Sequence, residues 1–247
     1  MEPFISRDGQ YLFFNSRNDP AVNTDLYYAS RIDDQTFAFS GPVSGVNGPD
    51  LDAVASLDTQ GHFYFVSTRS YSSTLSTIYR GTFATGGVTG VAVVPGISAL
   101  RAGTVNFDAE ISADGQTLWF DDGQFSAGGV LRAARIVIAN RQGAVFARQA
   151  DSTRLLAAVN VGGLNYAPCI SADGLELFFT RVESTTSGAA PAIYRAARVD
   201  THAAFAEPER VTGAAGFVEA PSLSGNGRLL YFHKRVNGRF AVYHLER

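Results

Sequence analysis

The stretch from Glu2 to Arg17 reads EPFISRDGQYLFFNSR, and four similar stretches follow it along the chain. They read DAVASLDTQGHFYFVSTR from Asp52, DAEISADGQTLWFDDG from Asp108, APCISADGLELFFTRV from Ala167 and APSLSGNGRLLYFHKR from Ala220. Their anchoring glycines are separated by 52, 54, 59 and 53 residues and are Gly9, Gly61, Gly115, Gly174 and Gly227. Five units of nearly equal length therefore make up the 247 residues.

Each unit has the pattern of short β-strands joined by tight turns. The Asp-Gly, Gln-Gly and Asn-Gly pairs before the aromatic runs indicate hairpins, because glycine supplies the positive φ that tight hairpins need. Runs such as Leu12-Phe13-Phe14 do not alternate with polar residues, as is typical of strands covered on both faces. A second motif closes each unit: DLYYASR (25–31), TIYRGTF (77–83), VLRAAR (130–135), AIYRAAR (192–198) and AVYHLER (241–247).

Radially arranged four-stranded sheets cover both faces of each strand, because every sheet packs against two neighbours. The sequence therefore predicts an all-β fold, a single five-bladed β-propeller of four-stranded antiparallel blades over residues 1–247. The repeats are expected at about 1–50, 51–106, 107–165, 166–218 and 219–247.

The last blade is a special case. The chain begins on the innermost strand of the first unit and ends at Arg247, on the third strand of the fifth. We expect either a three-stranded last blade or a blade completed by upstream residues. An unfinished blade exposes an edge that can pair with another chain, which predicts self-association at this edge.

The S-x-D-G-x-x-L-x-F core, as in Ser6 to Phe14 and Ser112 to Phe120, resembles the WD40-like propeller repeats of the TolB type. The resemblance covers essentially the whole chain. Such repeats occur in periplasmic and secreted binding proteins, in assembly factors and beside peptidase domains. It therefore implies a propeller, a binding role and a periplasmic or secreted location, without identifying the ligand.

Composition narrows the classes of function. Only 17% of the residues are charged and the formal net charge is −3, which argues against nucleic-acid binding through a basic surface. No apolar run approaches the roughly 20 residues that span a bilayer. The lone cysteine, Cys169, excludes an internal disulfide and a Cys-cluster zinc site. The four histidines are spread over three repeats without metal-ligand spacing, and no cofactor is predicted from them: His62, His202, His233 and His244.

Carboxylates gather at one predicted face, where the inner strands begin and the second strands end. The acids at the starts of the inner strands are Glu2, Asp52, Asp108 and Glu219. The arginines at the ends of the second strands are Arg17, Arg69, Arg181 and Arg235. The acids could bind a cation such as calcium or a basic ligand group. The commoner outcome is that each carboxylate pairs with an arginine or caps backbone amides.

The third unit departs from this pattern. Asp121-Asp122-Gly123 replaces the arginine-containing segment of the other copies, and Glu110 adds a carboxylate on the inner strand. This sector loses an arginine and gains acids, so we expect either a ligand site or a solvated acidic loop.

Asparagine and aromatic side chains also precede the inner strands. Amides beside aromatic rings suit carbohydrate or peptide recognition, although asparagines equally serve turns and aromatics fill blade seams. The predicted ligand-binding residues are Asp108, Glu110, Asp121, Asp122, Asn106, Asn165, Tyr166 and Glu219.

Three functions remain open at this point. The first is a non-catalytic binding module that presents the channel-mouth face to a protein, peptide or carbohydrate. The second is a glycosidase using Glu2, Asp52 and Asp108, which needs two carboxylates about 5–5.5 Å or about 6.5–9.5 Å apart around one bond. The third is a propeller stabilised by calcium in or near its channel.

Overall fold

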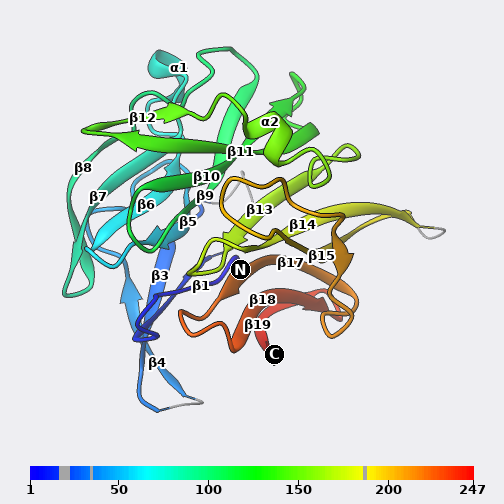
Figure 1. Ribbon diagram of the computed structural model, residues 1–247. Coiled ribbons are helices and arrows are strands. Elements are labelled where there is room, and N and C mark those ends of the chain that lie inside the picture. The colour runs from blue at the N-terminus through cyan, green and yellow to red at the C-terminus, as the bar shows by residue number, and fades with distance from the viewer. Residues whose placement is uncertain (17–22, 34–35, 186–187) are drawn as a thin grey trace.

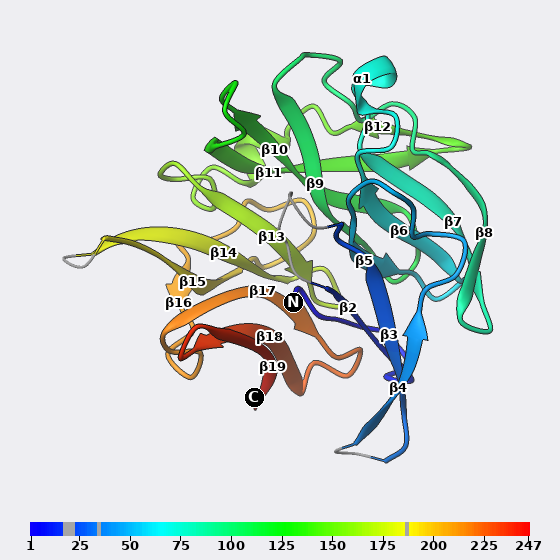
Figure 2. The same ribbon diagram turned by 180° about the vertical axis from the view of Figure 1, so that it is seen from behind.

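The computed structural model describes residues 1–16, 23–33, 36–185 and 188–247 as five small antiparallel sheets arranged in a ring (Figures 1 and 2). The predicted five-bladed β-propeller is confirmed. Blade 1 consists of β1 (Phe4–Ile5), β2 (Tyr11–Asn15), β3 (Leu26–Arg31) and β4 (Phe37–Pro42). Blade 2 consists of β5 (Asp52–Leu57), β6 (His62–Ser67), β7 (Ile78–Ala84) and β8 (Gly87–Val93).

The remaining blades follow the same order from the inner to the outer strand. Blade 3 consists of β9 (Thr104–Ile111), β10 (Thr117–Phe125), β11 (Leu131–Gln142) and β12 (Val145–Arg148). Blade 4 consists of β13 (Asn165–Ile170), β14 (Glu176–Thr185), β15 (Gly188–Ala197) and β16 (Glu209–Arg210). Blade 5 consists of β17 (Phe217–Leu223), β18 (Leu229–Val236) and β19 (Arg239–Glu246).

Blade 5 has three strands in the described structure, as one of the two alternatives predicted. β19 is its outermost strand, and Figure 1 shows it in red at the rim of the ring. The two helices, α1 (Tyr71–Thr74) and α2 (Ser152–Leu155), have four residues each. Within the described ranges, no helix is long and apolar enough to cross a membrane.

The S-x-D-G motif builds the turn between the first two strands of a blade. The Ser6 hydroxyl donates to Asp8 Oδ1 (2.6 Å) and accepts from the Tyr11 amide (2.9 Å). Gly9 has φ 73°, a conformation that a β-carbon disfavours. In blade 2, Asp58 takes the place of the serine and its carboxylate accepts from two amides of the same turn. The second repeat therefore builds its turn with aspartate in place of serine, and this turn is one residue shorter, since the Asp58 amide bonds to the His62 carbonyl where the Ser6 amide bonds to the Tyr11 carbonyl.

Each inner strand carries one residue in the left-handed region, four positions before the first residue of the S-x-D-G turn. These residues have φ between 49° and 54° and are Glu2, Val54, Asp108, Ala167 and Ala220. The pairing register of the inner strand shifts at this point in blades 2 to 5, which identifies a β-bulge. Asp52 and Glu219 therefore do not occupy the repeat position of Glu2 and Asp108.

A polar side chain at the end of each second strand lies 13 residues after the left-handed residue. Four of these side chains accept a hydrogen bond from the amide of the left-handed residue in the next blade. The pairs are Asn15 with Val54 (2.9 Å), Asp121 with Ala167 (2.8 Å), Thr180 with Ala220 (3.0 Å) and His233 with Glu2 (2.9 Å). This ring of latch residues ties adjacent blades around the channel.

Candidate functional site at the channel mouth

The end of the channel opposite the latch residues is closed by an ion pair between blades 1 and 3. Arg7 Nη2 lies 2.6 Å from Glu110 Oε1 and also donates to the Ile111 carbonyl (3.0 Å). Ser56 donates to Glu110 Oε2 (2.9 Å). The two charged side chains are 7% and 5% exposed. Glu110, a predicted ligand-binding residue, therefore belongs to a buried plug and not to the mouth.

Between this plug and the mouth lies a cavity of about 30 Å³, lined by Glu2, Asp108 and the neighbouring inner-strand residues. One water molecule occupies a share of about 30 Å³ in the liquid, so the space suits about one water. The channel between the plug and the mouth therefore has no room for a larger ligand.

A chain of hydrogen bonds crosses the mouth from blade 4 through blade 5 to blade 1. The Tyr166 hydroxyl donates to Glu219, and the other oxygen of that carboxylate lies 2.9 Å from His233 Nε2. His233 Nδ1 accepts the hydrogen bond from the Glu2 amide. Because Nδ1 is an acceptor, Nε2 carries the hydrogen and donates to Glu219. This network fixes both the ring orientation and the tautomer of His233.

Asp108 and Asp121 lie beneath this chain and are buried. Burial raises the pKa of the Asp108 carboxyl well above its usual value, and the charges of Glu2 and Glu219 raise it further. Burial likewise raises the pKa of Asp121, with a further contribution from Asp108. Within the described part of the chain, Asp121 Oδ1 has no hydrogen-bond partner. Two buried carboxyls that interact cannot both ionise readily, so the pair holds a proton to higher pH than an exposed aspartate does.

A row of half-buried aromatic rings borders the mouth at blades 3 and 4. The Phe107 ring lies 6.3 Å from the Phe125 ring and 6.4 Å from the Tyr166 ring. Gly123 provides the space for this row, because a β-carbon there would lie 2.5 Å from Phe107 Cε1. We call Glu2, Asp108, Asp121, Tyr166, Glu219 and His233, together with Phe107 and Phe125, the mouth site.

Asp122, the second acid of the unusual segment in blade 3, does not belong to the mouth site. Arg148 donates to both of its oxygens, each over 2.8 Å, and Asn106 donates to one of them over 2.7 Å. The expectation that this sector lacks a compensating arginine is wrong for Asp122. Arg148 lies on β12, the outer strand, and its guanidinium stacks over Phe120 as that of Arg69 stacks over Phe65.

Asp52 and Asn165 occupy the repeat position equivalent to Asn106, two residues before the left-handed residue. Asp52 is fully buried, and its carboxylate binds Arg69 (2.6 Å) and the Gly48 amide (2.7 Å). Asn165 Oδ1 accepts from Arg181 Nε (2.8 Å). All three side chains fasten arginines or loops inside their own blades, so none of them faces a ligand at the mouth.

The other predicted partners divide between described and undescribed parts of the chain. Arg17 lies outside the described residues. Arg235 stacks on Phe217 and Phe240, 5.8 Å from each ring centroid, and forms no ion pair with a predicted acid within the described residues. No group of three or more His, Cys, Asp or Glu that could hold a metal ion is found among the described residues.

Three of the four latch residues, Asn15, Thr180 and His233, were not among the predicted site residues. The signal was present in the sequence, since a polar residue follows the aromatic run at the same offset in these repeats and at Asp121. In blade 2 the strand register places Val66 at this position, and Val66 has no side-chain acceptor. The plug, by contrast, has no such signal because only one repeat supplies Arg7 and only one supplies Glu110.

Comparison with known proteins places the fold but not the function. No family model matches the sequence, and no curated protein matches it. TolB from Acinetobacter baumannii has a TM-score of 0.56 and 17% identity, over 100% of this chain and 51% of that chain. The putative TolB from Agrobacterium tumefaciens has a TM-score of 0.54 and 18% identity, over 99% and 76%.

A putative exo-beta-1,3-galactanase from Bifidobacterium bifidum s17 is also similar, with a TM-score of 0.59 and 10% identity over 99% of this chain and 86% of that chain. This chain spans about half the length of the Acinetobacter protein. The likeness to TolB that the repeats indicate is therefore present in the fold. At these identities the neighbours show the fold alone.

Proposed function

We propose that the chain is a non-catalytic binding module that holds an extended ligand, a peptide or a glycan, at the mouth site. The observation that carries this proposal is the row of Phe125, Phe107 and Tyr166 beside the polar network of Glu219 and His233. Aromatic rings supply apolar contact area, and the adjacent carboxylate and imidazole supply directional hydrogen bonds.

The rigidity of the mouth supports this role. Tyr166 and His233 are each held by hydrogen bonds to Glu219, and Phe107 lies against Gly123. Side chains already fixed in place lose little conformational entropy when a ligand binds. The closed channel directs the ligand to lie across the mouth.

A glycosidase is the second candidate, and one observation favours it. Asp108 retains a proton close to the carboxylates of Glu2 and Glu219, as a general acid beside a nucleophile or base would. Two observations speak against a glycosidase. The Asp52 carboxylate is paired with Arg69, and Asp108 is only 7% exposed to a substrate. Hydrolysis of aryl glycosides and β-linked polysaccharides by the wild type, abolished in Asp108→Asn, would favour the enzyme over the binding module.

The test of the binding proposal is a glycan and peptide array probed with three proteins. Gly123→Ala forces Phe107 and Phe125 to move, because the new β-carbon would lie within 3.0 Å of both rings. Phe39→Ala is the matched control, since Phe39 is 67% exposed on β4, away from the mouth site. We expect wild type and Phe39→Ala to bind the same ligands and Gly123→Ala to bind them about fivefold or more weakly. Equal binding by all three proteins, or no ligand on either array, would overturn the proposal.

A periplasmic or secreted location is part of the same proposal. It is supported by the resemblance of the repeats and the fold to TolB. Immunoblotting of fractionated native cells tests it, with the protein expected outside the cytoplasmic fraction.

A further inference from the structure

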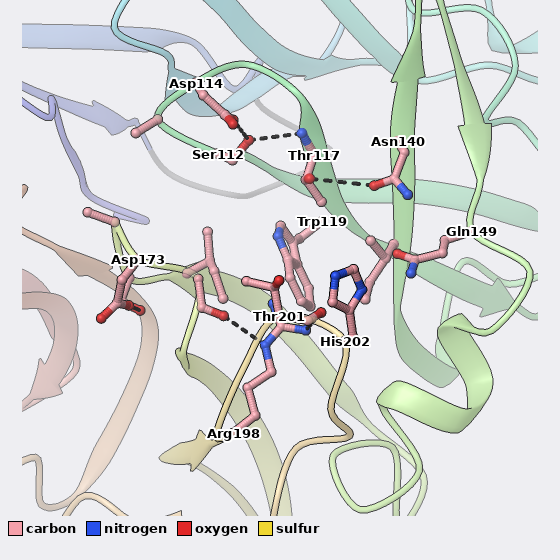
Figure 3. A pocket seen from close by; sticks show the side chains of 16 residues that line it. Ser112, Asp114, Thr117, Trp119, Asn140, Gln149, Asp173, Arg198, Thr201 and His202 are labelled. Carbon is pink, nitrogen blue, oxygen red and sulfur yellow. Dashed lines mark hydrogen bonds between the residues drawn. The ribbon is translucent and has the colours of Figure 1, made fainter.

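A second pocket lies between blades 3 and 4, at the end of the molecule opposite the mouth site. β9 begins at Thr104 near the mouth and ends at Ile111, so the turn that follows it, residues 112–115, lies at the other end. This turn and the equivalent turn of blade 4, residues 171–174, border the pocket (Figure 3). Its volume is about 360 Å³, within the range of about 300–1,000 Å³ that is usual for small-molecule sites.

The floor of this pocket contains Trp119, the only tryptophan of the chain. The residue is 2% exposed, with the Arg198 guanidinium 5.6 Å from its ring centroid and the Phe205 ring 5.8 Å away at an angle of 74°. Figure 3 shows the indole at the centre of the lining side chains. These neighbours cover the ring, so Trp119 offers its N–H edge and not a stacking surface.

The indole N–H of Trp119 has no hydrogen-bond partner among the described residues. The strand register places phenylalanine at this position in two blades and tyrosine in two others: Phe13, Phe178, Tyr64 and Tyr231. Packing in the blade seam therefore does not require a donor here. The indole nitrogen is not sealed off inside the chain and is open to the pocket, where an acceptor on a ligand can replace water as its partner.

Other polar groups with spare capacity line the same pocket. Asn140 Oδ1 lies 3.5 Å from the Thr117 hydroxyl, while its Nδ2 has no partner in the described part of the chain. Gln149 donates through Nε2 to Asp151 (2.8 Å), which leaves its Oε1 as an acceptor. The His202 ring makes no hydrogen bond within the described ranges. The pocket thus offers both donors and acceptors.

The charged side chains of the pocket narrow the class of ligand that could hydrogen-bond to these donors and acceptors. Arg198 donates through Nε to the Gly174 carbonyl and through Nη1 to the Thr201 carbonyl, each over 2.8 Å, and its Nη2 makes no hydrogen bond within the described residues. The carboxylates of Asp114 and Asp173 stand at the rim and repel an anion. An ammonium group, which only donates, would leave the donors of Trp119 and Asn140 unpaired. Hydroxyl groups donate and accept, and carry no charge.

We propose that this pocket binds a neutral sugar of about the size of one hexose, with its hydroxyls accepting from Trp119 Nε1 and Asn140 Nδ2. The site lies apart from the mouth site and is independent of the function proposed there. A ligand of about a dozen non-hydrogen atoms held by hydrogen bonds is expected to bind with a dissociation constant near 1 mM.

The fluorescence of Trp119 reports binding directly, because no other tryptophan contributes. Glucose, galactose, mannose and N-acetylglucosamine are titrated to about 50 mM, a range that saturates a millimolar site. We expect a saturable change with at least one of them. Asn140→Ala should weaken binding about 3- to 10-fold, the loss of one neutral hydrogen bond. Gln142→Ala, two residues along β11 and outside the pocket, is the control and should bind as the wild type does.

Trp119→Phe, studied by calorimetry, removes the N–H and introduces the phenylalanine that two other blades have at this position, so it should fold and bind more weakly. The absence of a saturable change with all four sugars would overturn the proposal, as would equal affinities for wild type, Asn140→Ala and Trp119→Phe. Gly123→Ala should leave the titration unchanged. Failure at the mouth site and failure at this pocket are therefore separate results.

Discussion

The imidazole of His233 in blade 5 accepts, at Nδ1, the hydrogen bond that the Glu2 amide of blade 1 donates over 2.9 Å. This contact closes the ring between the first and the last blade. It has the geometry of the latch bonds at other seams, where Asn15 and Thr180 accept from the next blade. The closing seam is thus fastened by the same side-chain position as the internal seams.

Substitutions at His233 test the latch. His233→Val removes the acceptor and leaves the buried Glu2 amide unpaired, whereas His233→Asn retains an acceptor of the kind that Asn15 provides in blade 1. We expect His233→Val to lower the free energy of unfolding by about 1–3 kcal/mol more than His233→Asn. Urea unfolding measures the difference. Equal stabilities of the two variants would show that the bond does not hold the ring.

Asp121→Asn tests the buried carboxyl pair. The raised folded-state pKa means that protonation stabilises the fold fully below about pH 4, and that this contribution is lost as the pH rises through the raised value. Asparagine keeps an acceptor for the Ala167 amide and does not ionise. We expect Asp121→Asn to match the wild-type melting temperature near pH 4 and to exceed it at pH 8. A lower melting temperature for the variant at pH 8 would contradict the proton-holding pair.

The fold follows from local patterns, because the S-x-D-G turn and the aromatic run recur in every unit. The β-bulge in the inner strand is the reason why the sequence grouped acids that occupy different repeat positions. The extra residue shifts which side chains face the channel, so Val54 and not Asp52 takes the place of Asp108. Asp52 lies two residues before Val54, and this offset cannot be seen when the repeats are aligned on their acidic residues.

The ion-pair partners of Asp122 and Glu110 come from distant segments and could not be predicted from the sequence either. Arg148 reaches Asp122 from the outer strand of the blade, 26 residues away, and Arg7 reaches Glu110 across the channel, 103 residues away. Neither pairing follows a repeat. The exposure of the Trp119 N–H to the pocket likewise depends on how blades 3 and 4 pack together, and no sequence motif predicts it.

Arg7→Met tests the channel plug. It leaves Glu110 buried without its cation, and removing one partner of a buried ion pair costs about 3–5 kcal/mol. The double variant Arg7→Met with Glu110→Gln removes both charges and should recover much of that loss. Chemical denaturation of the two variants checks both values. If Arg7→Met unfolds within about 0.5 kcal/mol of the wild type, the plug does not stabilise the channel.

Val242→Pro tests self-association through β19. Asn237 and Gly238, with φ 51° and 77°, form the two-residue turn before β19, so Val236 and Arg239 are a hydrogen-bonded pair. Alternation then turns the Val242 amide towards the open edge. We expect concentration-dependent dimerisation of the wild type in sedimentation experiments and a monomeric Val242→Pro variant. A wild type that stays monomeric at about 100 μM, or a variant that dimerises equally, would exclude this edge as the contact.

Hydrogen–deuterium exchange with and without a saturating array-selected ligand tests the mouth site most directly. Bound ligand should slow exchange at the start of β9, at the end of β10 around Gly123 and at the start of β13. These segments are residues 104–107, 122–125 and 165–167. Exchange in the turns at the opposite end, residues 112–115 and 171–174, should not change. Protection confined to other parts of the propeller, with unchanged exchange around Phe107 and Tyr166, would contradict the account.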